Sequence, residues 1–379
     1  LKTRRRRQIR IARETAVYGR REDLHALEEA FASARRGEGR GLLLVGEAGI
    51  GKTRLVDLFL HDPSLEDAHL LYGSWPPWGS EGAVSESILQ HFATTGLKEG
   101  LEELLDTPED LVASFAALLE RRPAPAGSPG LPRDMILTLV SQLLRTLAAE
   151  KPVVWVLEDL QFANSAAREM VMGMARAAES LPCLIVLTSS PPLPSPEALA
   201  WSELPHTATR TLSRLSPREV MLLLEDALGS GVLAEKLGGS IAKRSDGVPF
   251  FIHETIRTLR DQGLLQRMSD SSWTDADLVD AIEVPTSVRE LIERRLSTLS
   301  SDERAALDVS AVLGYQFNPM LVAEVLDRAP LPVRQELAAI ERRTGVVQPD
   351  GRRMRFDHHQ IQEVLYASVP ELLREAYHA

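Results

Sequence analysis

The feature that most constrains the fold is a glycine-rich segment, GEAGIGKT, between a short apolar run and an amphipathic segment. The apolar run, residues 41–45, is too short for a helix and is bounded by glycines, which predicts a buried strand. Residues 52–61 carry apolar side chains at helical spacing. Strand, glycine-rich turn and helix in this order match GxxxxGK[ST], a pattern whose backbone N–H groups surround a phosphate. The pattern predicts a phosphate-binding loop that comprises Gly46, Gly49, Ile50, Gly51, Lys52 and Thr53.

Two side chains of this loop have distinct predicted roles. Lys52 is expected to neutralise the β and γ oxygens of a nucleotide, which makes it a catalytic as well as a binding residue. The hydroxyl of Thr53 is expected to ligate Mg²⁺. The alternative is a glycine-rich turn that carries a surface lysine, with no ligand.

A second candidate element is an acidic pair at the end of another apolar run, residues 153–157. Open parallel sheets bind ligands at the carboxyl ends of their strands, and Glu158 and Asp159 would lie there. We assign Glu158 to the metal ion and Asp159 to the attacking water, and the reverse order stays open. The alternative is that the two carboxylates only end a strand and cap the next helix.

Apolar runs alternate with amphipathic segments in the first half of the chain, which predicts the α/β class with a parallel sheet. The expected strands are 41–45, 68–73, 153–157 and 184–188, and the expected helices include 22–36, 52–61, 135–149 and 165–178. A proline-rich segment, 191–205, is expected to close this layer. From Ser216 onward the pattern is helical, apart from a hairpin expected over 344–356. Helices with one hairpin predict a winged-helix module.

Charge is unevenly distributed along the chain. The formal net charge is −11, although residues 1–13 carry seven basic side chains and no acid. We interpret this basic segment as a solvated linker, with an arm for nucleic acid or a membrane surface as the alternative. The acidic remainder disfavours a nucleic-acid surface. No apolar run approaches the length of a membrane span, and the single cysteine, Cys183, fits a reducing cytoplasm. Because the chain begins with Leu1, it is expected to be part of a longer protein.

Further motifs occur in a fixed order around these elements. They are YGRREDL at 18–24, LEDL at 157–160, ANS at 163–165, SDGVPFF at 245–251 and VPTSVRELI at 284–292. With the phosphate-binding loop, this series resembles the STAND class of AAA ATPase modules, known from MalT-like and LuxR-type bacterial regulators and from fusions to kinases or cyclases. The resemblance implies ATP/ADP and Mg²⁺ as cofactors. The implied organisation is a basic linker (1–16), a P-loop ATPase domain (17–205), a helical domain (206–283) and a winged-helix domain (284–379).

The resemblance also implies roles for individual residues. Gly19 and Arg20 would lie near the adenine and the phosphates, and Pro249 would pack on the adenine. His358 would contact the β-phosphate of ADP and hold the inactive state. The sequence departs from the family pattern in having Gln161 and Phe162 where His-Trp is usual. It also has Ser190 where an arginine usually follows the third strand, and hydrolysis is therefore expected to be slow.

Together these features predict a cytoplasmic switch that is closed with ADP and open with ATP. The ATP form is expected to self-associate, and weak ATP hydrolysis would reset it. An effector domain upstream and a helical-repeat sensor downstream are expected in the longer protein. Two alternatives stay open: a DNA-binding regulator module that uses the winged helix, and a scaffold that binds nucleotide without hydrolysis.

Overall fold

The computed structural model describes residues 18–75, 82–125, 130–191, 200–261, 292–293, 296–297, 299–351, 353–357 and 359–378. Contacts divide the chain into two compact units. One is Gly19–Ser213, called here the α/β unit. The other consists mainly of Arg214–Ala379, called here the C-terminal unit.

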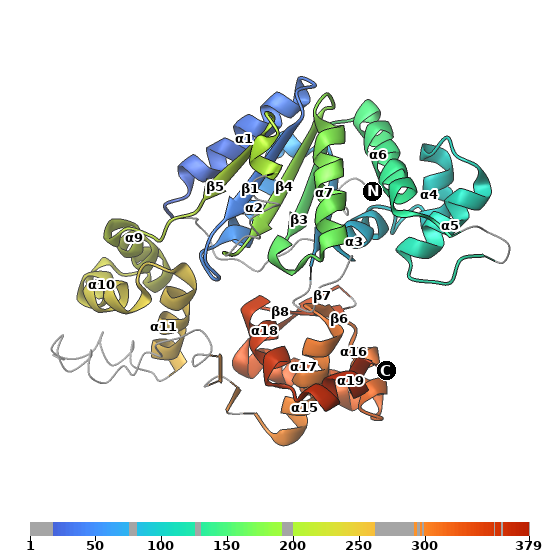
Figure 1. Ribbon diagram of the computed structural model, residues 1–379. Helices are drawn as coiled ribbons and strands as arrows, with labels where there is room; N and C mark the ends of the chain where they lie inside the picture. Colours follow the sequence, from blue (N-terminus) through green and yellow to red (C-terminus); the bar gives the residue numbers. More distant parts are fainter. Residues whose placement is uncertain are drawn as a thin grey trace. The chain divides into compact units, whose positions relative to one another are not determined.

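The α/β unit contains a five-stranded sheet within the described residues (Figure 1). Its strands are β1 (Arg40–Val45), β2 (His69–Ser74), β3 (Val153–Glu158), β4 (Cys183–Ser189) and β5 (Thr207–Thr211), in the order β2-β3-β4-β1-β5. All pairs are parallel, and Val45 pairs with Ser189 while Ser74 pairs with Glu158. The segments that follow β1, β3 and β4 therefore leave the sheet at one edge, where parallel sheets bind ligands.

The unit also contains helices, several of which pack against the sheet. They are α1 (Arg21–Arg35), α2 (Lys52–Leu60), α3 (Gly82–His91), α4 (Leu97–Leu104), α5 (Glu109–Leu119), α6 (Arg133–Glu150) and α7 (Ser165–Ala178), with the short 3₁₀ helices η2 (Pro63–Leu65) and η3 (Leu160–Phe162). Every residue of β3 and β4 is buried. Trp155 of β3 lies in this core, and its indole Nε1 donates to Ser87 Oγ at 2.9 Å, which satisfies its polar group. The predicted α/β class with a parallel sheet is confirmed.

The sheet extends beyond residue 205, where the sequence predicted the α/β layer to close. Strand β5 pairs with β1 along its whole length, and the unit ends at Ser213. The sequence TATRT gave no strand signal because β5 is an edge strand with three exposed residues and lacks an apolar run. The proline-rich segment is thus followed by one more strand of the same sheet.

The C-terminal unit begins with three helices, α9 (Pro217–Leu228), α10 (Gly231–Ser245) and α11 (Pro249–Asp261). Ser216 caps α9 in a capping box with Glu219, as the Ser-Pro start signal predicted. These helices enclose a cluster of buried apolar side chains that includes Leu224, Leu237 and Ile252. The predicted boundary between residues 283 and 284 lies outside the described residues, as does the basic linker 1–16.

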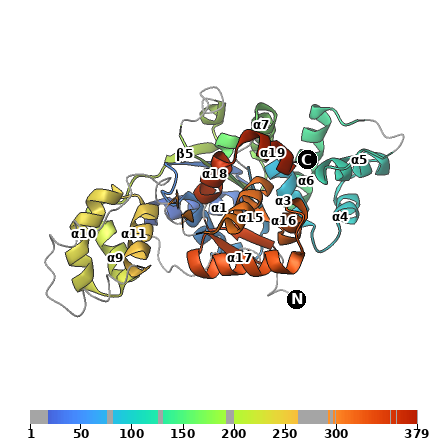
Figure 2. The ribbon, with the colours of Figure 1, turned by 90° about the horizontal axis from the view of Figure 1, so that it is seen from below.

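A second cluster in this unit is built from helices and a small sheet. The elements are α15 (Ser301–Leu313), β6 (Gln316–Phe317), α16 (Pro319–Val325), α17 (Pro330–Thr344), β7 (Val347–Asp350), β8 (Arg353–Phe356), α18 (His359–Ser368) and α19 (Glu371–His378). Helices α15, α16 and α17 pack against one another (Figure 2). The antiparallel pair β7 and β8 confirms the predicted hairpin. Among the described residues, no helix combines the length and apolarity that crossing a membrane requires.

Candidate functional site

The glycine-rich loop leaves β1 at Val45 and becomes α2 at Lys52. Gly49 and Gly51 have φ values of 79° and 100°, in the left-handed region that glycine adopts without strain. These two residues let the backbone curl between strand and helix, so that the amino end of α2 is presented to a ligand. Such a helix terminus offers unpaired N–H groups and a partial positive charge to an anion.

Lys52 is folded back over this loop. Its Nζ donates to the carbonyl oxygens of Gly46 at 2.8 Å and Glu47 at 3.1 Å, and to Ser190 Oγ at 3.0 Å. Only 7% of Lys52 is exposed, which excludes the alternative of a surface lysine on an ordinary turn. The ammonium therefore lies between the loop and the residue that follows β4.

Glu158 lies at the end of β3 and is completely buried. Its Oε2 accepts a hydrogen bond of 2.7 Å from the Tyr72 hydroxyl of β2, and the Thr53 side chain also hydrogen-bonds to the carboxylate. Its Oε1 is buried and has no hydrogen-bond partner among the described residues. Such a buried oxygen is costly to maintain unless a ligand or a cation completes its coordination.

The pKa of Glu158 is raised to about 7, chiefly by burial and then by the neighbouring charge of Asp159. The hydrogen bonds from Tyr72 and Thr53 and the charge of Lys52 act in the opposite direction. A cation placed against Oε1 would favour the ionised form in the same way as Lys52 does. The carboxylate is therefore suited to bind a cation near neutral pH.

Asp159 follows directly, with a left-handed φ of 62°. Its backbone N donates to Thr188 Oγ1 at 3.0 Å, and its Oδ1 accepts from Gln161 Nε2 at 3.1 Å. The Oε1 of Gln161 accepts from the backbone N of Ser190 at 2.9 Å. The amide of Gln161 thus joins Asp159 to the residue that Lys52 contacts. A non-glycine residue with positive φ at this position is typical of a functional site.

Neither acid caps the helix that follows. Asp159 makes no side-chain capping hydrogen bond to η3, and α7 is capped by Asn164, whose side chain accepts from Ala167 N at 2.8 Å. The helix-capping role that the alternative assigned to the acidic pair is therefore not observed, and the metal and water roles of the two acids stay predictions. Its two carboxylates instead lie beside Thr53 and Gln161.

The site fits a magnesium ion held by few protein atoms. Thr53 and Glu158 are hydrogen-bonded to each other and offer oxygen ligands, which Mg²⁺ prefers. The described residues contain no group of three or more His, Cys, Asp and Glu side chains that could hold a metal by themselves. Mg²⁺ commonly takes several of its ligands from phosphate and water. When bound, Mg²⁺ would neutralise charge on the phosphate oxygens.

The raised pKa of Glu158 predicts a pH-dependent stability of the protein without nucleotide or magnesium. The folded state holds this proton more tightly than the unfolded state, so the contribution of Glu158 to stability is lost as pH rises from about 4.5 to about 7 and then stays constant. Glu158→Gln should remove this loss and raise the free energy of unfolding at pH 8 by up to about 3 kcal/mol. At pH 4 the two proteins should be equally stable.

The measurement is urea unfolding in EDTA between pH 4 and pH 8. The fluorescence of Trp75, Trp155 and Trp201 reports on the α/β unit, where all three lie buried. Glu169→Gln, an exposed position on α7, is the control and should follow the wild type. A Glu158→Gln protein that loses stability with pH as the wild type does would contradict the assignment of this proton to Glu158.

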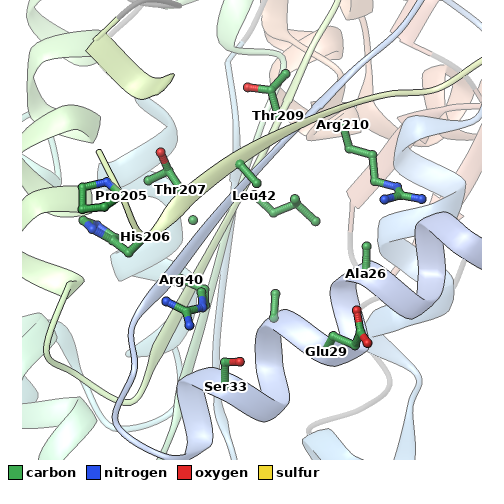
Figure 3. Close-up of a pocket in the computed structure, with 13 residues that line it drawn as sticks. Ala26, Glu29, Ser33, Arg40, Leu42, Pro205, His206, Thr207, Thr209 and Arg210 are labelled. Carbon is green, nitrogen blue, oxygen red and sulfur yellow. The ribbon is translucent and has the colours of Figure 1, made fainter. Parts of the chain in front are cut away.

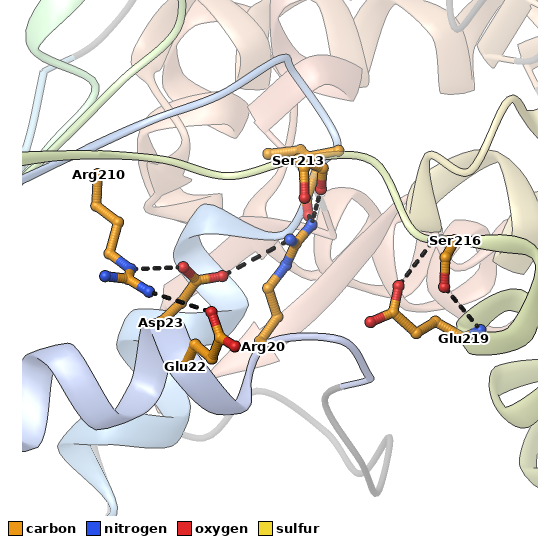
Figure 4. A network of polar contacts seen from close by, with 8 residues as sticks. Arg20, Glu22, Asp23, Arg210, Ser213, Ser216 and Glu219 are labelled. Carbon is orange, nitrogen blue, oxygen red and sulfur yellow. Dashed lines mark hydrogen bonds and ion pairs between the residues drawn. The ribbon is translucent and has the colours of Figure 1, made fainter.

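Gly19 and Arg20 precede α1, and Gly19 has a φ of 66°. The guanidinium of Arg20 does not extend into open space. Its Nη2 donates to the carbonyl oxygen of Ile50 in the phosphate-binding loop and to that of Ser213 (Figure 4). Arg20 therefore contacts the backbone of the loop, and the implied place of Gly19 and Arg20 near the adenine and the phosphates stays a prediction.

Two predicted ligand contacts are not tested by these observations. Position 358 lies outside the described residues, so a contact of His358 with the β-phosphate stays a prediction. Pro249 begins α11 in the C-terminal unit, and its packing on the adenine also stays a prediction.

Several residues of the site were not predicted from the sequence. Tyr72, Thr188 and the bridging role of Gln161 emerge only from the pairing of β3 with β2 and β4. Parallel pairing in register does indicate that residues after neighbouring strands meet at one edge. It does not indicate which of them hydrogen-bond to one another.

A hollow of about 390 Å³ lies elsewhere in the α/β unit (Figure 3). It is lined by one side of α1 and by residues near the beginnings of β1 and β5, including Ser33, Arg40, His206 and Thr207. None of the predicted site residues lines it. The phosphate-binding loop instead follows the carboxyl end of β1.

Comparison with known proteins agrees with this geometry. Residues 16–187 match the family model of the AAA ATPase domain. The chain is 26% identical over 389 residues to an uncharacterised protein of Rhizobium meliloti (strain 1021), covering 96% of this chain and 36% of that protein. The fold of the present chain is similar to that of a signal transduction ATPase with numerous domains (STAND) from Pyrococcus horikoshii, which has a tetratricopeptide repeat sensor. That match has a TM-score of 0.54 and 15% identity, and covers 96% of this chain and 44% of the other.

The parallel sheet, the glycine-rich loop with its buried lysine and the acidic pair define a P-loop ATPase. The match of residues 16–187 to the AAA ATPase domain model agrees with this class. The chain spans 36% of the length of its curated relative, so a larger protein's activity is not assigned by this match.

Proposed function

We propose that this chain is a nucleotide-operated switch of the STAND class. It binds ADP or ATP with Mg²⁺, hydrolyses ATP slowly, and thereby controls the opening and self-association of a larger regulatory protein. The observation that carries the proposal is the hydrogen-bonded series from Lys52 through Ser190 and Gln161 to Asp159. It joins the group expected to bind phosphate to the group expected to act on water.

In this proposal the residues divide the chemistry among them. The loop N–H groups and Lys52 hold the phosphates, and Thr53 and Glu158 hold the magnesium ion. Asp159 polarises the attacking water. Its carboxylate is held at the sheet edge by a hydrogen bond from Gln161. Ser190 supplies a hydroxyl where relatives carry a cation, so less transition-state charge is neutralised and turnover is slow.

The assignment to the STAND class is supported by the ordered motifs and by the fold likeness to the Pyrococcus horikoshii protein. That protein is described as a signal transduction ATPase with a tetratricopeptide repeat sensor. By analogy, we propose that the larger protein carries an effector domain and a helical-repeat sensor outside this chain. The switch itself would operate in the cytoplasm.

We also propose that residues 284–379 are a winged-helix domain. The order α15, β6, α16, α17, β7, β8, with β8 central in an antiparallel sheet, supports this. The described charges do not favour DNA as its partner, since α17 mixes Arg334, Arg342 and Arg343 with Glu336 and Glu341. From the resemblance to the STAND class, we infer that this module closes over the nucleotide.

The proposal predicts that the bound nucleotide controls assembly. With Mg-ADP the chain should be monomeric, and with Mg-ATP it should form larger species, because a ligand shifts a two-state equilibrium by its differential affinity. Light scattering coupled to size-exclusion chromatography measures the mass, and phosphate release measures turnover. The mass of the Lys52→Ala protein should not change when either nucleotide is added.

Two outcomes would contradict parts of this proposal. The same mass with ADP and with ATP, despite measured binding of both, would exclude a nucleotide-controlled assembly. Binding without any phosphate release would exclude the hydrolytic reset and favour the scaffold that binds nucleotide permanently.

A further inference from the structure

We infer that Arg20 is a positioning residue that orients the peptide between Ile50 and Gly51 for phosphate binding and links it to Ser213, where the α/β unit ends. The inference rests on the proposed nucleotide site and adds a regulatory connection to it. It differs from a direct contact with the nucleotide, because Arg20 here acts through the backbone of the loop.

The contacts of Arg20 are long-range in sequence and shielded from water. Its side chain is only 4% exposed. The Nη2 nitrogen donates to Ile50 O at 3.0 Å and to Ser213 O at 2.7 Å. A guanidinium nitrogen of this kind has two hydrogens, and each is accounted for by one of these carbonyls. This end of the side chain is therefore committed to protein backbone.

Asp23 lies beside the other nitrogen of the guanidinium and is itself paired with Arg210 (Figure 4). Asp23 Oδ2 lies 3.7 Å from Arg20 Nη1, and Asp23 Oδ1 accepts from Arg210 Nε at 2.8 Å. Arg210 Nη2 in turn lies 3.9 Å from Glu22. Two cations thus face two anions, which compensates the burial of Arg20 and fixes the plane of its guanidinium.

The carbonyl that Arg20 contacts lies where the backbone of the loop is intrinsically free to turn. Ile50 lies between Gly49 and Gly51, which both have left-handed φ and no side chain to restrict the backbone. A trans peptide is planar, so the N–H of Gly51 points away from the carbonyl oxygen of Ile50. By holding that carbonyl on one side, Arg20 directs the Gly51 N–H to the other side. The N–H groups of this loop are the expected phosphate donors.

The second carbonyl connects the same nitrogen to the end of the unit. Leu212 N donates to Val45 O at 2.8 Å, which fixes the chain after β5 against β1. Ser213 is the next residue and the last of the α/β unit, before the chain continues into the C-terminal unit. A movement of the Ile50 carbonyl on phosphate binding would therefore change the hydrogen bond at Ser213. Arg20 is placed to transmit the state of the loop to this junction.

The test compares Arg20→Lys and Arg20→Ala with Arg21→Ala, an exposed arginine one position away. Calorimetry measures the binding of Mg-ADP and of Mg-pyrophosphate to the full chain. A lysine side chain is shorter and lacks the planar fork that holds Asp23 through Nη1 while Nη2 donates to the two carbonyls, so both Arg20 variants should bind each ligand roughly tenfold more weakly. The fold loss should be equal for the two ligands, since both depend on the phosphate-binding N–H. Arg21→Ala should bind like the wild type.

Hydrogen exchange provides a readout that a merely structural role would not change. In the wild type, ADP should slow exchange at residues 212–216, and Arg20→Lys at saturating ADP should not show this protection. Thermal unfolding checks that both variants are folded. If Arg20→Ala does not fold, Arg20→Lys alone serves as the test variant.

The possible outcomes separate the hypotheses. A loss confined to ADP, with pyrophosphate binding unchanged, would make Arg20 a nucleoside contact and overturn the inference. Wild-type affinity in Arg20→Lys, or protection at 212–216 that persists in it, would also overturn it. If the wild type binds ADP but not pyrophosphate, the loop does not bind phosphate by itself, and the inference is overturned. If neither the wild type nor Lys52→Ala binds nucleotide, the proposed function itself is wrong.

Discussion

Lys52→Ala should weaken ADP and ATP binding roughly ten- to hundredfold while the protein stays folded. The ammonium is expected to contact phosphate, and a hydrogen bond to a charged group contributes about 1.5–3 kcal/mol. Lys52 contacts Gly46, Glu47 and Ser190 but lies outside the apolar core, so its removal leaves the core packing unchanged. Titration with a fluorescent ADP analogue measures the loss.

The control for this variant is Lys98→Ala. Lys98 is exposed on α4 and forms an ion pair with Glu102 one helical turn away, a pair of small energetic value. It should bind ADP like the wild type, with the same melting temperature. Unchanged affinity in a folded Lys52→Ala protein would show that the glycine-rich loop does not hold the phosphates.

The fold was predicted best where burial dictates the sequence. Strands β1, β3 and β4 are buried on both faces and therefore appear as continuous apolar runs, and α7 has the predicted bounds of 165–178. Strand β5 and helix α4 were missed. The first is a polar edge strand, and the second is a short helix that contains Gly100. In both, tertiary contacts outweigh weak local preference.

The site could be predicted only in part for a related reason. Local pattern was sufficient for the loop from Gly46 to Thr53 and for the acidic pair, because each combines residue type with a strand end. The partners of these residues depend on strand order, which the sequence did not determine. Tyr72, for example, contacts Glu158 because β2 is the neighbour of β3. Arg20 was expected near the phosphates. Its hydrogen bonds to carbonyl oxygens could not be predicted, because they depend on how β5 pairs with β1.

The second large effect is expected for Asp159→Asn, which should slow ATP turnover about a hundredfold or more. General-base catalysis contributes a factor of roughly 10²–10⁴, and the amide lacks the charge that polarises water. Its position should be kept, because the Asn oxygen can still accept from Gln161 Nε2. Phosphate release at saturating Mg-ATP measures the effect. Asp106→Asn, at an exposed position, should turn over like the wild type.

Binding should change in the opposite direction from turnover. The charge of Asp159 raises the pKa of Glu158, so removing that charge lowers this pKa and leaves Glu158 more ionised at neutral pH. Mg-ATP should therefore bind Asp159→Asn at least as tightly as wild type, and the variant should remain in its ATP-bound, assembled form. An Asp159→Asn protein that binds Mg-ATP and hydrolyses it at the wild-type rate would show that Asp159 does not act on the water. If the variant no longer binds Mg-ATP, the roles assigned to the two acids are reversed, and Asp159 is the metal ligand.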